Sequence, residues 1–363
     1  MDKGITQDTK IYVAGHRGLV GSAIWKNLEA RGFKNLIGRT HSELDLTDAD
    51  AVRHFFDAEK PEVVVVAAAK VGGIMANSKY RADFIVENLA IQQNVITQAW
   101  RHGVKHLLFL GSTCIYPREA PQPIKEEYLL TDSLEYTNEP YAIAKIAGMK
   151  MCESLNLQYG TQYISVMPTN LYGPGDNFHL ENSHVLPAMI RKIHLANLLS
   201  KGDYDGIRRD LDVRPVKGYD PTLTDSQIAD ILAHYGLFND RVELWGSGQP
   251  LREFLWSEDM ADASVYILLN VSFDELSKNC PDKIRNTHIN IGTGLEHTIA
   301  QTARMVKDTI GYDGKIVWDN SKPDGTMRKL CDVSRLNALG WKHSVELPDG
   351  INQLYSWYCQ TLQ

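Results

Sequence analysis

Three residues in the first half of the chain have the types and order needed to reduce a carbonyl group. Tyr141 and Lys145 are four residues apart in a helical stretch, so their side chains lie on one face. Ser112 ends an apolar run that precedes them. As hydride reaches a carbonyl carbon, charge grows on the oxygen, where Tyr141 can donate a proton and Ser112 a hydrogen bond. A Lys145 cation nearby is expected to lower the pKa of the phenol.

Two further side chains are candidates for acid–base work. Cys114 follows Ser112 by two residues, so on a continuing strand both side chains would point to the same side. His184 follows the strand predicted at 163–170 and a glycine-containing loop. A lone cysteine usually packs in a core and a lone histidine is often a satisfied polar group. The residues alone therefore leave both the catalytic and the structural interpretation open.

A glycine pattern precedes these residues. Gly15, Gly18 and Gly21 form G-x-x-G-x-x-G between a predicted strand (11–15) and a predicted helix (19–32). The first glycine permits a tight turn, the second lets backbone approach a pyrophosphate, and the third lets helix and strand pack closely. The helix then offers free N–H groups to the anion. Between a strand and a helix, the pattern predicts a dinucleotide-binding turn.

The residues after the second predicted strand indicate which dinucleotide is bound. An acid in this place would bind the ribose hydroxyls of NAD. The stretch LIGRTHSELDL (36–46) instead carries Arg39 and His41, and Arg17 stands in the glycine turn. These cations suit the 2'-phosphate of NADP, while Glu43 comes late for the NAD acid. The sequence favours NADP(H).

Apolar runs alternate with helical patterns through the first 170 residues. The predicted strands lie at 11–15, 63–69, 107–112 and 163–170, and the predicted helices at 19–32, 83–103 and 141–160. Such alternation predicts an α/β protein with a Rossmann-type doubly wound parallel sheet, whose chemistry lies at the carboxyl ends of the strands. The run at 287–294 is predicted to return to this sheet. Thr298, followed by Gln301, predicts a capping box that opens a helix at 298–311.

The alternation loosens after residue 170, which predicts a second, smaller mixed α/β domain. We expect the cofactor-binding domain to span 8–170 plus about 253–294. The substrate-binding domain is expected to span about 171–252 plus 295–363.

Two features leave alternatives open. Asp45, with Leu46, fits a contact to the adenine side of the cofactor, but Asp45 is equally suited to cap a helix. The segment 200–240 is rich in glycine, proline and charge and contains one short helical pattern, TDSQIADILAHYG. It is interpreted as a surface insertion that is either neutral decoration or a lid or oligomer contact.

Composition excludes several classes of protein. Apolar residues make up 43% and charged residues 23% of 363, as in a globular protein. The net charge of -7 disfavours nucleic acid as a partner, because phosphate binding requires a basic field. The five cysteines lack CxxC spacing, so neither a disulfide framework nor a metal site is expected. No apolar run approaches the roughly 18 residues of a membrane span, and the cytoplasm is the expected location.

Several stretches resemble the GDP-L-fucose synthase family of extended short-chain dehydrogenases/reductases, over nearly the whole chain except 200–240. They include AGHRGLVGSAI (14–24), AAAKVGGIMAN (67–77), FLGSTCIYP (109–117), NEPYAIAKIAG (138–148), SVMPTNLYGPGDNFH (165–179), NSHV (182–185), WGSGQPLREFL (245–255) and SKPDGTMRKL (321–330). The cysteine after the serine is specific beyond the general dehydrogenase class. The resemblance implies NADPH-dependent 3,5-epimerisation and 4-reduction of GDP-4-keto-6-deoxy-mannose.

The resemblance also implies roles for individual residues. Ser112, Tyr141 and Lys145 would form the reductase set, with Cys114 and His184 as the epimerase base and acid. The implied cofactor-binding residues are Gly15, His16, Arg17, Gly18, Leu19, Val20, Gly21, Arg39, His41, Asp45, Leu46, Asn88, Leu110, Gly111, Ser112, Lys145, Pro168, Asn170, Leu171 and His184. The implied ligands of the nucleotide sugar are Lys192, Trp245, Arg252, Asp324 and Lys329. The helices at 83–103 and 141–160 would pair across a two-fold axis in a homodimer.

The chain departs from the family pattern at two cations. Lys192 stands where an arginine is expected, although Arg191 is adjacent, and His41 replaces an arginine near the 2'-phosphate. Three alternative functions remain: action on a related GDP-keto-sugar of colitose or heptose type, an epimerase or dehydratase that recycles NAD, and a silent dinucleotide sensor. Dehydratases need an acid pair after the serine, where this chain has Thr113 and Cys114. Sensors typically lose the tyrosine or lysine, and both are present here.

Overall fold

The computed structural model describes residues 4–278, 280, 283–322 and 324–363, which divide into two compact units. The first unit comprises Met1–Leu171, Glu253–Leu295 and Leu330–Ser344. The second comprises Tyr172–Arg252, Glu296–Lys329 and Val345–Gln363. We had assigned all of 295–363 to the second domain, so the return of 330–344 to the first unit corrects the prediction. Among the described residues, no helix combines the length and apolar character required to cross a membrane.

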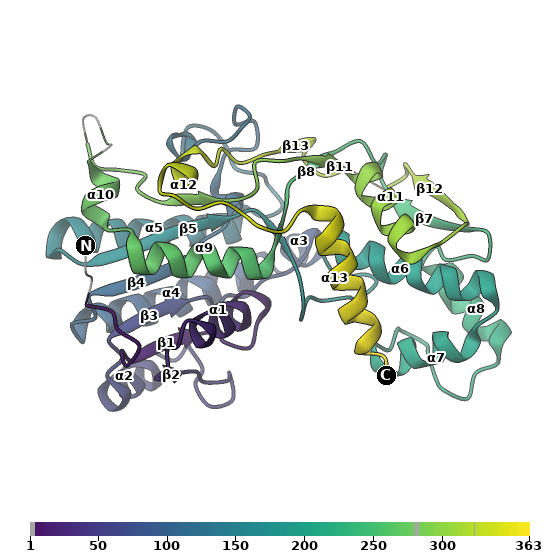
Figure 1. The fold of residues 1–363 in the computed structure, drawn as a ribbon, viewed down its shortest axis with the longest axis horizontal. Coiled ribbons are helices and arrows are strands. Elements are labelled where there is room, and N and C mark those ends of the chain that lie inside the picture. Colours follow the sequence, from purple (N-terminus) through teal and green to yellow (C-terminus); the bar gives the residue numbers. More distant parts are fainter. Residues whose placement is uncertain (1–3, 279, 281–282, 323) are drawn as a thin grey trace. The chain divides into compact units, whose positions relative to one another are not determined.

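A parallel sheet forms the centre of the first unit, in the order β10-β5-β4-β3-β1-β2. Its strands are β1 (Ile11–Ala14), β2 (Leu36–Ile37), β3 (Val63–Val66), β4 (His106–Leu110), β5 (Gln162–Pro168) and β10 (Ile289–Ile291). Figure 1 shows helices on both sides of this sheet. The predicted doubly wound sheet is confirmed, including the return of the chain through β10.

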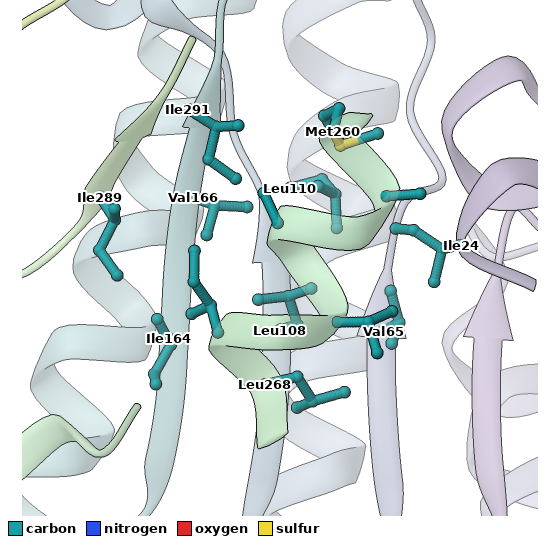
Figure 2. Close-up of a cluster of buried hydrophobic side chains, with 14 of the residues drawn as sticks. Ile24, Val65, Leu108, Leu110, Ile164, Val166, Met260, Leu268, Ile289 and Ile291 are labelled. Atoms are coloured by element: carbon teal, nitrogen blue, oxygen red, sulfur yellow. The ribbon is translucent and has the colours of Figure 1, made fainter. Parts of the chain in front are cut away.

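Alternate strand residues point to opposite faces and build two separate cores. On one face, α1 (Leu19–Ala30) and α9 (Ser257–Asn270) cover residues such as Val65, Leu108 and Val166. Figure 2 shows this cluster, with Ile24 of α1 opposite the strands. On the other face, α2 (Ala49–Glu59), α4 (Arg81–Arg101) and α5 (Glu139–Tyr159) pack on the intervening strand residues. Burial on both faces explains the continuous apolar runs of the strands.

Short elements complete the first unit and its edges. They are α3 (Ile74–Lys79), the 3-10 turns η1 (Thr113–Ile115) and η2 (Glu126–Tyr128), β6 (Asn170–Tyr172), β9 (Phe254–Trp256), α10 (Phe273–Ser277) and α12 (Ser334–Ala338). One expectation was wrong here: the strand predicted at 107–112 ends at Leu110, and a 3-10 turn follows. Asp48, not Asp45, caps α2 by accepting hydrogen bonds from the N–H groups of Asp50 and Ala51.

The second unit is built around α6 (Val185–Lys201). A parallel pair joins β7 (Arg241–Trp245) to β12 (Lys315–Asp319), and a second small sheet has the order β11 (His297–Thr298), β8 (Leu251–Arg252), β13 (Arg328–Lys329). The remaining helices are α7 (Tyr204–Val213), α8 (Asp225–His234), α11 (Ile299–Ile310) and α13 (Leu347–Gln360). The predicted capping box is present, since Thr298 and Gln301 exchange side-chain and backbone hydrogen bonds.

The segment 200–240 is not a surface insertion, and this corrects the sequence interpretation. Ile207 and Leu211 of α7 and Ile228 and Leu232 of α8 are completely buried. The two helices place apolar faces in the core of the second unit, and α7 also buries Gly206 and Asp210 there. The other glycines, prolines and charged residues of the segment are partly or fully exposed.

Candidate active site

The glycine turn between β1 and α1 has the shape of an anion cradle. Gly15 has φ +84°, a conformation that favours glycine, and its carbonyl oxygen accepts a 3.0 Å hydrogen bond from the N–H of Gly18. Gly18 is the N-cap of α1 and has no side chain to bond the first N–H groups of the helix. A Cβ on Gly18 would have one backbone neighbour, 3.5 Å away, so the approach is open. These features fit the pyrophosphate of a dinucleotide.

Cations surround His16, the residue that follows Gly15. Burial lowers the pKa of His16, and the charges of Arg17 and Arg39 lower it further, against an opposing effect of Glu43. The turn and the end of β2 thus place two guanidinium groups and one imidazole close together. Arg17 and Arg39 therefore both act on His16, and their binding of a 2'-phosphate stays a prediction.

Other residues predicted near the 2'-phosphate and the adenine have different surroundings. Arg39 already has a partner, because its guanidinium forms a 2.5 Å ion pair with Glu59 of α2. His41 is exposed, with 85% of its side-chain surface accessible, and lies 3.9 Å from Asp45. Asp45 accepts hydrogen bonds from the N–H and hydroxyl of Thr47 at 2.9 and 2.7 Å. Asp45 therefore organises the turn that presents Leu46.

The reductase residues meet at the carboxyl end of β4. Ser112 follows this strand directly, and Tyr141 and Lys145 lie one turn apart on α5. The ammonium of Lys145 donates a 2.7 Å hydrogen bond to the carbonyl oxygen of Leu110 and lies 5.8 Å from the centre of the Tyr141 ring. One strand end and one helix face therefore hold all three side chains.

Burial decides the protonation of this pair. It raises the pKa of Tyr141 well above the ordinary value, and an electrostatic interaction with Cys114 adds to the effect. It lowers the pKa of Lys145 to about 8. The expected lowering of the phenol pKa by Lys145 is wrong, because burial dominates the pKa of Tyr141. Tyr141 is thus held as the protonated form that a proton donor requires.

Cys114 belongs to the same site. The strand does not continue through Cys114, so the prediction that Ser112 and Cys114 share one side of a strand was wrong. A 3-10 turn brings the two residues together instead. Ser112 caps η1 by accepting a 3.2 Å hydrogen bond from the N–H of Cys114. An electrostatic interaction with Cys114 also contributes to the raised pKa of Tyr141.

Residues from other strand ends border this centre. Asn88 of α4 is buried and holds the loop after β3 by bonding the N–H and the carbonyl of Lys70, at 2.9 and 3.0 Å. Gly111 donates a 2.8 Å hydrogen bond to the carbonyl of Val166. After Pro168 ends β5, Asn170 donates from its amide to the carbonyl of Glu253 at 2.8 Å, and Leu171 packs against the core. The predicted cofactor residues of the first unit thus gather at the carboxyl edge of one sheet.

The predicted ligands of the nucleotide sugar form a cluster in the second unit. Lys192 of α6 is 7% exposed, and its ammonium lies 5.9 Å from the ring of Trp245, at the end of β7. That ammonium donates a long hydrogen bond to the carbonyl of Glu243, at 3.4 Å. Burial lowers the pKa of Lys192 to about 8. Its cation is thus directed at an aromatic face that is itself 54% exposed.

The other predicted ligands of the nucleotide sugar lie in the small sheet formed by β11, β8 and β13 or in the segment that leads into it. Arg252 of β8 stands opposite Lys329 of β13 in the pairing register. Asp324 accepts hydrogen bonds from the N–H and hydroxyl of Ser247, and these bonds, together with the Arg252 charge, lower its pKa. Asp324 therefore fixes the turn after Trp245 and lies beside Arg252.

Arg191 cannot take the part of the arginine expected at 192. Its side chain is fully buried and forms an ion pair with the fully buried Asp210 of α7, with a 2.8 Å separation. It also donates a 3.2 Å hydrogen bond to the carbonyl of Phe178. The guanidinium is a structural cation of the second unit, so Arg191 does not replace Lys192 beside Trp245.

A family model described as "NAD dependent epimerase/dehydratase family" matches residues 11–216 and 213–292. The chain belongs to this family. Among its relatives, the GDP-L-fucose synthase 1 of Arabidopsis thaliana is 51% identical over 98% of this chain and 95% of its own. The GDP-L-fucose synthase of Escherichia coli K12 is 46% identical over 97% of both chains. The solved structure of a GDP-mannoheptose C4 reductase from Campylobacter jejuni with NADP bound is 44% identical, covers 98% of this chain and 100% of its own, and has a TM-score of 0.87.

In this member of the epimerase/dehydratase family, two supporting residues escaped the sequence analysis. Lys322 places its ammonium 5.6 Å from the Trp245 ring and belongs to the same motif, 321–330, as Asp324. Glu253 is completely buried, and its carboxylate accepts 2.7 Å hydrogen bonds from the N–H groups of Thr293 and Gly294. A charged residue inside the apolar stretch LREFLW was the available signal for Glu253.

His184 lies in the second unit, at the N-cap of α6, where its side chain makes no capping hydrogen bond and is exposed. Its catalytic role, and its role in cofactor binding, stay predictions.

Proposed function

We propose that this protein is an NADP-dependent epimerase-reductase that converts GDP-4-keto-6-deoxy-D-mannose to GDP-L-fucose. The observation that carries the proposal is Cys114 on η1, whose N–H donates to Ser112 and which interacts electrostatically with Tyr141. A plain reductase needs only the serine, tyrosine and lysine. The additional thiol supplies the proton transfer that epimerisation requires. Relatives of this chain at 46% and 51% identity are named as GDP-L-fucose synthases.

Different residues carry out proton transfer, stabilisation of the enolate and protonation around one ketone oxygen. A 4-keto group acidifies the C–H bonds at C3 and C5, and Cys114 and His184 move protons at these carbons on opposite faces. Ser112 and Tyr141 stabilise the enolate oxygen with hydrogen bonds. After inversion, Tyr141 gives its proton to the same oxygen as C4 is reduced. NADPH, when bound, supplies the hydride.

The cofactor and the sugar nucleotide are bound by separate sets of residues. Gly15 and the open N-terminus of α1 take the pyrophosphate of the cofactor, and Arg17 and Arg39 take the 2'-phosphate. Lys192, Arg252 and Lys329 supply positive charge for the diphosphate of the sugar nucleotide, Trp245 offers an aromatic face, and Asp324 positions the turn.

The test is an assay of GDP-4-keto-6-deoxy-mannose with NADPH or NADH in deuterium oxide. We expect GDP-L-fucose with one NADPH oxidised per product, deuterium at C3 and C5, and slower turnover with NADH. Turnover without net NADPH oxidation would identify an enzyme that recycles its cofactor and would overturn the proposal. Reduction without deuterium would restrict the activity to a reductase.

A related GDP-keto-sugar is the second candidate substrate. The 44% identical solved structure is named as a GDP-mannoheptose C4 reductase, so this relationship extends to heptoses. Parallel assays with GDP-4-keto-heptose and GDP-4-keto-6-deoxy-mannose compare the two, and the substrate with the higher kcat/KM is the preferred one.

We further propose a cytoplasmic homodimer. Helices α4 and α5 leave apolar side chains exposed, among them Val86 (63%), Ile143 (41%) and Leu157 (50%). Two copies that pair these helices would bury such residues. Light scattering at micromolar concentration should give twice the mass of 40.8 kDa, and a charged residue at Val86 should shift it toward the monomer. The five cysteines, all in the described part of the chain, form no disulfide, which is typical of a reducing compartment, and cell fractionation tests this location.

A further inference from the structure

The turn that carries Cys114 is weakly held by its own hydrogen bonds. Ser112 accepts from the N–H of Cys114 at 3.2 Å, and the backbone bonds of Ile115 and Tyr116 to Ser112 and Thr113 measure 3.3 and 3.4 Å. These distances are at or beyond the long end of the range for N–H···O bonds. Short 3-10 turns have poor hydrogen-bond geometry in general. Contacts outside the turn must therefore contribute to holding it.

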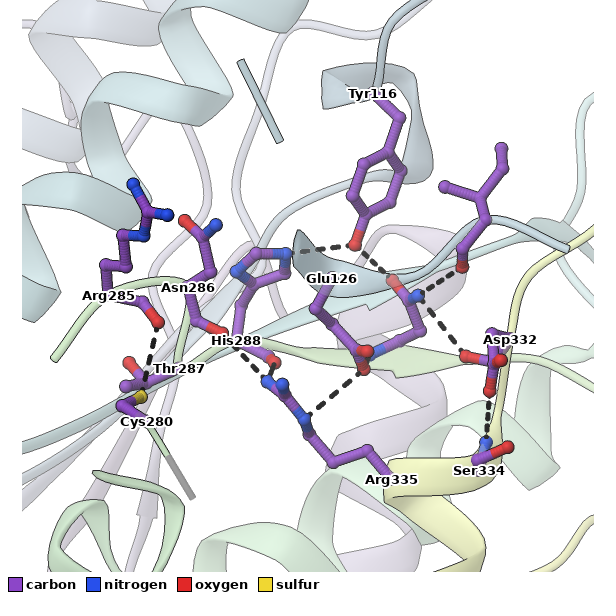
Figure 3. A network of polar contacts seen from close by, with 12 residues as sticks. Tyr116, Glu126, Cys280, Arg285, Asn286, Thr287, His288, Asp332, Ser334 and Arg335 are labelled. Carbon is purple, nitrogen blue, oxygen red and sulfur yellow. Dashed lines mark hydrogen bonds and ion pairs between the residues drawn. The ribbon is translucent and has the colours of Figure 1, made fainter. Parts of the chain in front are cut away.

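Tyr116, the C-cap of this turn, is anchored in a buried polar network. Its side chain is 3% exposed, and its hydroxyl forms a 2.5 Å hydrogen bond with Asn290 Oδ1 and a 2.9 Å bond with His288 Nε2. Both partners belong to the edge strand β10 or its immediate approach. Figure 3 shows the Tyr116 hydroxyl directed at His288.

The polar network around Tyr116 is held by further hydrogen bonds within the first unit. Asn290 is completely buried, its amide donates to the carbonyls of Ile124 and Asp332, and its N–H donates to Glu126 at 3.1 Å. Arg335 lies 3.8 Å from Glu126 and donates to the carbonyl of His288 at 2.7 Å. Figure 3 shows the guanidinium of Arg335 between these groups. The hydrogen-bond partners of the Tyr116 hydroxyl are thus fixed by several independent segments.

We propose that Tyr116 is a positioning residue that sets the place of the Cys114 thiol for epimerisation. This inference rests on the proposed function and deepens it. Cys114 lies on the weakly bonded turn, two residues from the anchor. Ser112 is closer to the sheet, where Gly111 bonds to Val166 at 2.8 Å, and Tyr141 and Lys145 are on α5. Loosening the anchor should displace the thiol more than the reductase residues.

The test compares Tyr116→Phe with the wild type on GDP-4-keto-6-deoxy-mannose with NADPH in deuterium oxide. We expect deuterium incorporation at C3 and C5 to slow at least tenfold. NADPH oxidation should persist, with the product shifted toward the directly reduced 6-deoxyhexose that retains its C3 and C5 configuration. A merely structural loss would lower both activities together and leave this product partition unchanged.

Tyr163→Phe is the matched control, because Tyr163 is 2% exposed in the same unit and its hydroxyl donates to the carbonyl of Val104 at 2.8 Å. That bond lies at the amino end of β5, away from the turn. Asn290→Ala removes an acceptor of Tyr116 and should shift the partition in the same direction. Asn290→Ala also tests the positioning role of Tyr116 if Tyr116→Phe fails to fold. The double variant should add little to either single change, as expected for one shared interaction.

A wild-type product partition in a folded Tyr116→Phe or Asn290→Ala variant would overturn the inference, as would an equal shift in Tyr163→Phe. The proposed function fails separately, if the wild-type protein does not turn over this substrate.

Discussion

The Cβ atom that alanine would add at Gly21 lies 2.1 Å from the carbonyl oxygen of Gly15. Helix α1 and the turn after β1 are therefore in direct backbone contact, which only glycine permits. Gly21→Ala should force the helix away from the turn, at a cost of about 1–3 kcal/mol or more, as for overpacked cores. We expect a lower melting temperature and no measurable NADPH binding by fluorescence titration.

Gly18→Ala provides the comparison for that variant. Its Cβ would lie 3.5 Å from the same oxygen, an ordinary contact, and the residue has φ -74°. The fold should tolerate this methyl, but it would stand where we propose that the pyrophosphate approaches. The melting temperature should stay near that of the wild type while the Kd for NADPH rises. Equal stability losses in both variants would argue against the distinction between packing and ligand approach.

Arg39 should govern the choice between NADPH and NADH. Hydrogen bonds to charged groups contribute about 1.5–3 kcal/mol, so Arg39→Ser should lower kcat/KM for NADPH roughly tenfold to a hundredfold. The value for NADH should change little, because NADH lacks the 2'-phosphate. Arg53→Ser removes a comparable guanidinium from the surface of α2, where it pairs with Asp50 and Asp57, and serves as the control. A parallel loss with both cofactors would place Arg39 outside the phosphate site.

Cys114→Ser should separate the two reactions. A hydroxyl is a much weaker base than a thiolate, so deuterium exchange at C3 and C5 should fall by at least a hundredfold, as for loss of an acid–base group. Direct reduction of the 4-keto group by Ser112, Tyr141 and Lys145 should remain detectable by NADPH oxidation. Cys359→Ser, a half-buried cysteine of the second unit, should leave both rates unchanged. If folded Cys114→Ser protein with intact NADPH binding loses both reactions equally, the separate roles are wrong.

The first unit was largely predictable because its signals are local. Apolar runs predict the buried strands, and the glycine spacing predicts the turn. Ser112, Tyr141 and Lys145 were predicted from their positions at a strand end and on a helix. The turn at Thr113–Ile115 was missed, because neither a proline nor a charged residue follows Leu110 before Tyr116 to end the predicted strand. Nothing in the local pattern reveals that the N–H of Cys114 is satisfied by Ser112.

Contacts between distant segments account for the other errors. Residues 330–344 return to the first unit because Ile124 and Glu253 bond to the backbone of Leu330 and Cys331, across gaps of 206 and 78 residues (330 − 124 and 331 − 253). The segment 200–240 was misjudged because many charges suggested exposure. One of those charges, Asp210, is buried with a partner 19 residues away in the sequence.

Lys192 should make substrate affinity depend on pH. Burial lowers its pKa to about 8, so its ammonium is charged below that pH and neutral above it. A bound diphosphate favours the charged form, so affinity should fall as pH rises through about 8. We expect KM for the GDP-sugar to increase between pH 7.5 and pH 9 while KM for NADPH follows a different course. Lys192→Arg keeps its charge over this range and should flatten the profile. A pH profile unchanged by this substitution would exclude Lys192 as its source.

Asp210 should be among the most important polar residues for stability of the second unit. Its carboxylate pairs with Arg191 and accepts a hydrogen bond from the hydroxyl of Tyr358, and all three side chains are completely buried. Asp210→Asn leaves the guanidinium buried without a counter-charge, which costs about 3–5 kcal/mol when one partner of a buried pair is removed.

Asp225→Asn breaks an exposed pair with Arg208 in the same segment and should cost no more than about 1 kcal/mol. Urea denaturation of both variants measures the difference. Similar, small losses would show that α7 is dispensable decoration, whereas a large loss confined to Asp210 would show that the segment 200–240 supports the helix that carries Lys192.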